Sequence, residues 1–173
     1  MKRPFVLSLA FVVILINASA QKTLVPSDSL RIWGEIEKAI TYDLEDLLKI
    51  KPTPLPDQII ANHNGEIKDT LTDLAGIGIQ HLLEPIVYRN EKPKYLNEFY
   101  FVFEATDGYR VVFSWNELFN TDIGQQVFIL TTIDGQPIQT LDQRIVVFST
   151  ADTNKGRRYV KCLQSIEVKR VGH

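Results

Sequence analysis

Short apolar runs separated by turn residues dominate the chain, a pattern typical of β-strands rather than of long helices. The densest run, residues 98–105 (EFYFVFEA), is rich in aromatic and β-branched side chains and predicts a core strand. Asn64-Gly65 and Asp107-Gly108 each lie between two extended runs, which predicts hairpins with type I′ turns. The other expected strands cover residues 30–36, 38–41, 59–60, 66–74, 109–114, 126–132, 144–150 and 158–168.

Three short segments show helical spacing instead. Leu44, Leu47 and Leu48 follow Asp43 at positions i, i+3 and i+4, and prolines at 52, 54 and 56 end the helix that they predict. Residues 77–83 predict a helix start that Pro85 stops, and residues 115–119 predict one helical turn capped by Ser114. Many short strands with two or three short helices predict a single α+β, mostly β, domain.

The first twenty residues have the pattern of a secretory signal peptide. Lys2 and Arg3 precede an apolar run over residues 5–16, and the small residues 18–20 follow it. A membrane anchor is the alternative, but this run is shorter than the roughly 20 residues that a membrane-spanning helix needs. We therefore expect a signal peptide at 1–20, a flexible lead-in at 21–29, one domain at 30–171, no membrane span in the mature chain, and a periplasmic or secreted protein.

Charge and cysteine content narrow the function classes. The 173 residues carry 19 Lys and Arg against 21 Asp and Glu, a formal net charge of −2, and this balance disfavours nucleic-acid partners. Cys162 is the only cysteine, so an intramolecular disulfide is excluded. Its apolar surroundings predict a packed, buried thiol rather than a reactive nucleophile. The three histidines have no ligand-pair spacing, and no metal site is predicted from them.

Several segments, in order along the chain, resemble the sulfite-oxidase-type molybdopterin-binding domain family. Residues 105–118 (ATDGYRVVFSWNEL) resemble one block of that family, and residues 75–83 (AGIGIQHLL) are similar to its helix entry. Residues 156–168 (GRRYVKCLQSIEV) resemble its G-x-R-x-V-K block, and residues 30–48 fit its opening. The resemblance implies a sulfite-oxidase-type, molybdopterin-binding-like fold over nearly all of the mature chain.

The resemblance also implies where a site would lie. In catalytic members a cysteine thiolate early in the domain binds molybdenum, and the arginine and lysine of the G-x-R-x-V-K block lie near the pterin cofactor. Arg158 and Lys161 match that block, within a run of four basic residues between positions 155 and 161. Arg110 matches the first block. The alternative for Arg158 and Lys161 is a solvated loop and an exposed strand face, and the alternative for Arg110 is a structural role as the packing partner of Tyr109.

The segment that matches the metal-binding region, residues 58–65, contains no cysteine. Asn62 and His63 would face the same cleft as Arg158 if the fold is of this type. The favoured alternative is that Asn64-Gly65 only makes a hairpin turn and that His63 is its exposed neighbour. The predicted cofactor-binding residues are therefore Arg158, Lys161, Asn62, His63 and Arg110, with no catalytic residues and no metal ligands assigned.

These observations predict an exported binding or accessory module that is not redox-active and binds a small anionic or pterin-like ligand. The alternative is a molybdopterin-dependent oxidoreductase with an altered metal ligand, for which His63 is the nearby candidate. An interaction protein that uses only its surface is a third reading. The expected cofactor is accordingly none or molybdopterin, and the sequence identifies no protein partner.

Overall fold

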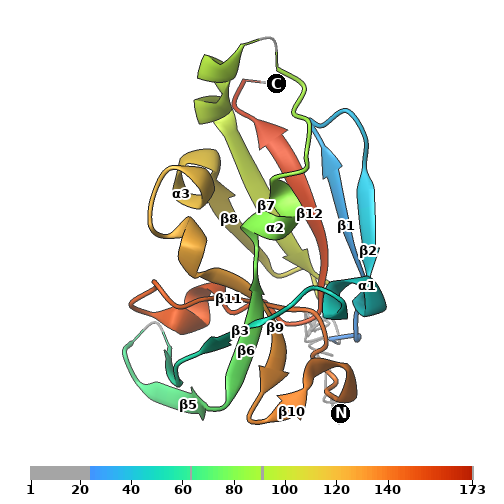
Figure 1. Ribbon diagram of the computed structural model, residues 1–173. Coiled ribbons are helices and arrows are strands. Elements are labelled where there is room, and N and C mark those ends of the chain that lie inside the picture. The colour runs from blue at the N-terminus through green and yellow to red at the C-terminus, as the bar shows by residue number, and fades with distance from the viewer. Residues whose placement is uncertain (1–23, 63, 91, 173) are drawn as a thin grey trace, which may run out of the picture.

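The computed structural model describes residues 24–62, 64–90 and 92–172, and five strands of this part form one twisted sheet (Figure 1). These strands are β1 (Ser29–Gly34), β2 (Ile40–Asp43), β7 (Phe99–Ala105), β8 (Arg110–Ser114) and β12 (Leu163–Arg170). Their order across the sheet is β2-β1-β12-β7-β8. β1 and β12 pair in parallel, and the other neighbours are antiparallel. The central strand pair therefore joins the two ends of the domain.

A second, antiparallel sheet and a separate hairpin form the lower half of the molecule in Figure 1. The second sheet has the order β10-β9-β6-β3, and β11 also pairs with β9. Its strands are β3 (Thr53–Leu55), β6 (Leu74–Gly78), β9 (Val127–Ile133), β10 (Gln136–Pro137) and β11 (Val146–Ser149). The hairpin consists of β4 (Gln58–Ala61) and β5 (Ile67–Leu71).

Helices in the described residues are short. The α-helices are α1 (Leu44–Leu48), α2 (Gln80–Leu83) and α3 (Trp115–Phe119), and the 3-10 turns are η1 (Pro93–Glu98), η2 (Gly124–Gln126), η3 (Ile138–Thr140) and η4 (Lys155–Arg158). The prediction that Ser114 caps α3 is confirmed, because Ser114 and Glu117 form a reciprocal capping box. The helix expected at 77–83 begins only at Gln80, because Ile77 and Gly78 belong to β6.

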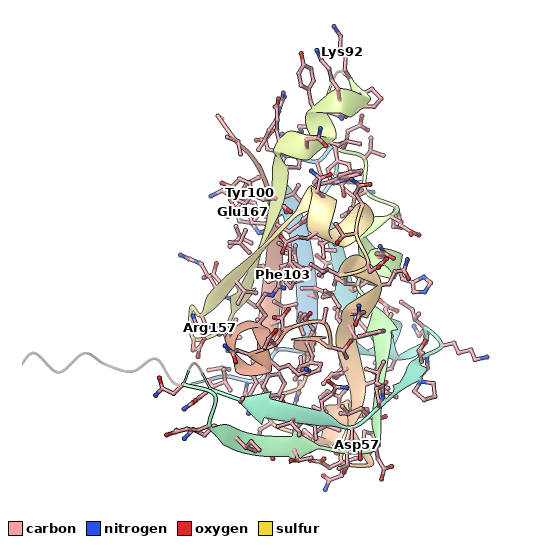
Figure 2. All side chains as sticks on the ribbon, turned by 90° about the vertical axis from the view of Figure 1, so that its left-hand side faces the viewer. Asp57, Lys92, Tyr100, Phe103, Arg157 and Glu167 are labelled. Atoms are coloured by element: carbon pink, nitrogen blue, oxygen red, sulfur yellow. The ribbon has the colours of Figure 1, made fainter. Side chains whose placement is uncertain are left out.

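Side chains along β7 and β8 of the five-stranded sheet alternate between the buried core and the outer face. Phe99, Phe101 and Phe103 are fully buried, whereas Tyr100 between them is only half-buried. Figure 2 shows Phe103 inside the molecule, with Tyr100 and Glu167 on the outer side of the same sheet. A smaller apolar cluster lies under the hairpin. Its buried members are Ile60, Leu71, Leu74, Leu130, Ile133, Ile138, Val146 and Phe148.

Both predicted hairpins exist, but their turns are not type I′. A type I′ turn needs positive φ at both central residues. Gly65 (φ 80°) and Gly108 (φ 87°) have it, while Asn64 and Asp107 do not. A side chain in each turn stabilises another turn geometry by accepting a hydrogen bond from the backbone two residues further on. Asn62 Oδ1 accepts from the Asn64 amide, and Asp107 Oδ1 accepts from the Tyr109 amide.

Two predicted strands are wrong in their extent. The run expected at 66–74 is two strands, because Asp73 adopts a left-handed conformation (φ 44°) between β5 and β6. The strand expected at 158–168 begins only at Leu163, because Cys162 is also left-handed (φ 51°). Its burial is as predicted: Cys162 has no exposed surface.

The first described residues lie against the domain. The Val25 amide donates to Thr106 Oγ1 at 3.1 Å, and the Thr106 hydroxyl donates to the Val25 carbonyl at 2.7 Å. Asp28 pairs with Arg144. These contacts hold the described part of the expected lead-in against the domain, and the signal peptide expected at 1–20 lies outside the described residues. In the described ranges, none of the helices has the length and apolar character needed to cross a bilayer.

Candidate functional site

A groove opens where the β4–β5 hairpin faces η4, which is the neighbourhood that the sequence indicated. Its volume is about 590 Å³. Asn62 and Lys68 of the hairpin, Tyr109 after the β7–β8 turn, and Arg157 and Tyr159 around η4 line it, together with Ile60, Ala61 and Gly156. We call this cavity the hairpin groove. It joins three segments that lie far apart in the sequence.

The close approach of η4 to the hairpin depends on Gly156. A Cβ atom at this position would lie 2.8 Å from the Ala61 carbonyl oxygen, which is too short for a normal contact. Tyr109 holds η4 in place from the β7–β8 hairpin, because its hydroxyl donates a hydrogen bond to the Arg157 carbonyl at 2.6 Å. The floor of the hairpin groove is therefore set by backbone packing.

Asn62 mainly builds the hairpin turn. Its Oδ1 accepts the amides of Asn64 at 2.9 Å and Glu66 at 3.0 Å, and its Nδ2 donates to Glu66 Oε2 at 2.8 Å. Lys68 donates to the same Glu66 oxygen at 3.0 Å. Hydrogen bonds from Lys68, and then from Asn62, lower the pKa of Glu66. Asn62 thus lines the groove with its amide oxygen and one of its two amide N–H groups already engaged in the turn.

Two tyrosine rings give the groove a partly aromatic wall. Tyr159 packs edge-on against Phe148, with ring centroids 5.7 Å apart. Burial raises the pKa of Tyr159 to about 12, so its phenol stays neutral at ordinary pH. The Lys161 ammonium lies 5.0 Å from the centroid of the Tyr159 ring. Lys161 is exposed and reaches the groove only through this contact.

Arg158 faces away from the groove and holds η4 to the body of the domain. Its Nε and Nη2 donate to the two carboxylate oxygens of Asp152 at 2.7 and 2.5 Å, and its Nη1 lies 3.2 Å from Glu117 Oε1. Its guanidinium carbon lies 4.2 Å from the centroid of the Phe113 ring. The Asp152 hydrogen bonds are the main cause that raises the pKa of Arg158. The Arg158 guanidinium N–H groups that could bind a phosphate are already hydrogen-bonded to the carboxylates of Asp152 and Glu117.

The structure therefore brings together only part of the predicted site. Asn62 lies in the groove and Lys161 at its edge, whereas Arg110 pairs with Glu104 at 2.9 Å on the outer face of the five-stranded sheet. His63 lies outside the described residues. Arg157 is the arginine that lines the groove, and it belongs to the basic run that the sequence had singled out. Nothing in the sequence pointed to Lys68 or Tyr159.

The donor atoms do not fit a thiolate-ligated molybdenum centre. Cys162, the only cysteine of the sequence, is buried away from the groove, and its thiol donates to the Asp142 carbonyl at 3.4 Å. Burial raises the pKa of this thiol, which opposes the thiolate form that binds metals. Within the described ranges, no three His, Cys, Asp or Glu side chains gather as a metal cluster.

The chain has an α+β, mostly β, fold, as the sequence predicted. The solved structure of the sulfane dehydrogenase SoxCD from Paracoccus pantotrophus is similar over 84% of this chain, with a TM-score of 0.56 and 15% sequence identity. The match covers 39% of that chain, so this protein spans well under half of its length. The sequence matches no described protein family and no curated protein. At this identity the likeness establishes the fold alone.

Proposed function

We propose that this chain is an exported binding or accessory module that holds a small anionic, pterin-like ligand in the hairpin groove. One observation carries the proposal. The exposed side chain of Arg157 lines the groove together with Tyr109 and Tyr159, and it forms no ion pair with the described residues. A groove that offers both a guanidinium and aromatic rings suits a flat ring that carries an oxyanion.

The dimensions and polarity of the groove support this ligand class. Its volume of about 590 Å³ is within the usual range for small-molecule sites. Lys68 already has a carboxylate partner in Glu66, and Lys161 stands at the rim. Arg157 is then the main source of attraction for an anion, and a ligand with a single oxyanion group matches it best.

The position of the only thiol supports a role without molybdenum redox chemistry. A thiol that is buried and hydrogen-bonded to Asp142 is held in its neutral form, whereas metal ligation requires the thiolate. Export is inferred from residues 1–20. Expression in a bacterial host tests it: the periplasmic protein should have the mass of a chain that begins at Gln21. A cytoplasmic, full-length product would contradict export.

Titration with pterin-6-carboxylate, followed by its own fluorescence, tests the groove. We expect saturable binding and a loss of affinity of about ten-fold in Arg157→Ala, because a charge-assisted hydrogen bond contributes about 1.5–3 kcal/mol. Lys92→Ala is the matched control, since Lys92 lies at one end of the molecule, far from Arg157 (Figure 2). Equal affinities of Arg157→Ala and the unchanged protein would overturn the site.

Elemental analysis of the protein purified from its native host tests the absence of redox chemistry. We expect molybdenum well below one atom per chain. Stoichiometric molybdenum together with a bound pterin would establish the oxidoreductase alternative and contradict this part of the proposal.

A further inference from the structure

A second hollow lies on the outer face of the five-stranded sheet and shares no residue with the hairpin groove. It has a volume of about 380 Å³ and lies over the ends of β1 and β12. Arg31, Trp33, Arg89, Lys169 and Arg170 line it, with Glu35 and Glu167. We call it the Trp33 hollow. Its four basic residues outnumber its two acidic ones, in a chain whose net charge is negative.

The backbone around this hollow is fixed by close contacts. Gly34 has φ 113°, and a Cβ atom there would lie 2.2 Å from the Val168 carbonyl oxygen, so β1 and β12 meet without a side chain between them. The Glu35 amide donates to the Val168 carbonyl at 2.8 Å, and the Arg89 amide donates to the Glu35 carbonyl at 3.0 Å. Arg89 is thereby held beside a strand pair that lies far from it in the sequence.

Two guanidinium groups in the hollow have no carboxylate partner among residues 24–62, 64–90 and 92–172. Lys169 pairs with Glu167 at 3.4 Å, and Arg170 pairs with Glu98 at 2.6 Å. Arg31 and Arg89 form no ion pair with any described residue. Since a guanidinium fork matches a carboxylate or phosphate group, these two arginines present an unfilled oxyanion site.

Trp33 adds a flat apolar surface beside these charges. Its side chain is 37% exposed, which is unusual for so large a ring, and the Arg31 guanidinium carbon lies 5.6 Å from its centroid. Trp33, Arg31 and Arg89 line the same hollow. We infer that the Trp33 hollow binds a small aromatic oxyanion, with the ring on Trp33 and the carboxylate or phosphate between Arg31 and Arg89.

Tryptophan fluorescence tests this inference directly, because the chain has only two tryptophans. Trp115→Phe leaves Trp33 as the sole reporter and keeps a ring against Phe119. AMP represents an aromatic phosphate, and phthalate represents an aromatic carboxylate. We expect at least one of them to quench Trp33 saturably, with adenosine and inorganic phosphate at least about ten-fold weaker, which corresponds to about 1.4 kcal/mol.

The variant Arg31→Gln with Arg89→Gln removes both charges and keeps a polar, hydrogen-bonding side chain at each position. In the Trp115→Phe background it should weaken the quenching ligand at least about ten-fold. Arg157→Ala should leave this response unchanged, which separates the hollow from the hairpin groove. Three results would overturn the inference: no saturable response to AMP or phthalate, an unchanged affinity in the double variant, or Trp33 emission that varies with protein concentration because a second copy covers it.

Discussion

Adjacent arginines in this chain have opposite roles at the scale of single residues. Arg158 is only 20% exposed and bridges Asp152 and Glu117, whereas Arg157 is exposed and lines the hairpin groove. Because Glu117 also completes the capping box of α3, Arg158 connects η4 to that helix. The two positions therefore separate stability from binding.

Arg158→Ala should lower the free energy of unfolding by about 2 kcal/mol, because it leaves two partly buried carboxylates without their partner. Urea denaturation measures the change. Arg157→Ala is the matched control and should stay within about 0.5 kcal/mol of the unchanged protein. If the two variants were equally stable, the ion pairs of Arg158 with Asp152 and Glu117 would not contribute to stability.

Cys162 should not react with 5,5′-dithiobis(2-nitrobenzoate) in the folded protein at pH 8. The thiol is buried, so the reagent cannot reach it. Burial also raises its pKa, which disfavours the reactive thiolate. The same protein in denaturing urea should release one thiol per chain, which calibrates the assay. Rapid labelling without denaturant would show an accessible thiolate instead.

At the scale of elements, the hairpin groove depends on one glycine. Gly156 lets η4 approach β4, although its φ is not in the left-handed region, so the requirement is for space alone. The hairpin itself packs on the smaller apolar cluster through Ile60 and Leu71. Displacement of η4 would therefore open the groove without removing any of its polar side chains.

Gly156→Ala should reduce stability by about 1–2 kcal/mol and weaken pterin-6-carboxylate binding, because its Cβ collides with the Ala61 carbonyl. Gly78→Ala is the control, since its Cβ would have its nearest neighbour at 3.9 Å. Thermal unfolding and the pterin titration measure both effects. Equal behaviour of the two variants would mean that η4 adjusts at no cost.

At the scale of the whole molecule, buried tyrosines lower the stability of the folded protein at alkaline pH. Burial raises the pKa of Tyr159 to about 12 and also raises that of Tyr88, whereas a tyrosine in the unfolded chain ionises near its ordinary value. Below that ordinary value both states are neutral and the contribution is constant. As the pH rises from about 10 to 12, only the unfolded chain gains by ionising, so stability falls.

Tyr159→Phe should therefore lose less stability than the unchanged protein between about pH 9 and 11.5. The difference should be about 1–2 kcal/mol, measured as the free energy of unfolding across this range. Tyr100→Phe is the control, because Tyr100 is only half-buried on the outer face of the five-stranded sheet. A parallel decline in all three proteins would contradict the assignment to Tyr159.

Particular elements show why sequence reasoning succeeded in some places and failed in others. β7 and α3 were predicted well, because alternation along 99–105 and the Ser114 cap are local signals. The strand expected at 158–168 was wrong at its start because left-handed Cys162 ends the extended path, and no local signal marks this conformation. Arg158 matched the family block, but Asp152 and Glu117, which occupy it, were invisible as partners.

The sequence by itself determined the fold class and indicated the basic segment near the hairpin groove. Its single cysteine also excluded an intramolecular disulfide. These follow from periodicity, composition and short-range motifs, which act between neighbours in the chain. Only the tertiary structure decided that Arg157 rather than Arg158 lines the groove, and that Arg31, Trp33 and Arg89 meet in a second hollow. The reason is physical: ion pairing and close backbone approach join residues that are distant in sequence, and they determine which side chains remain available to a ligand.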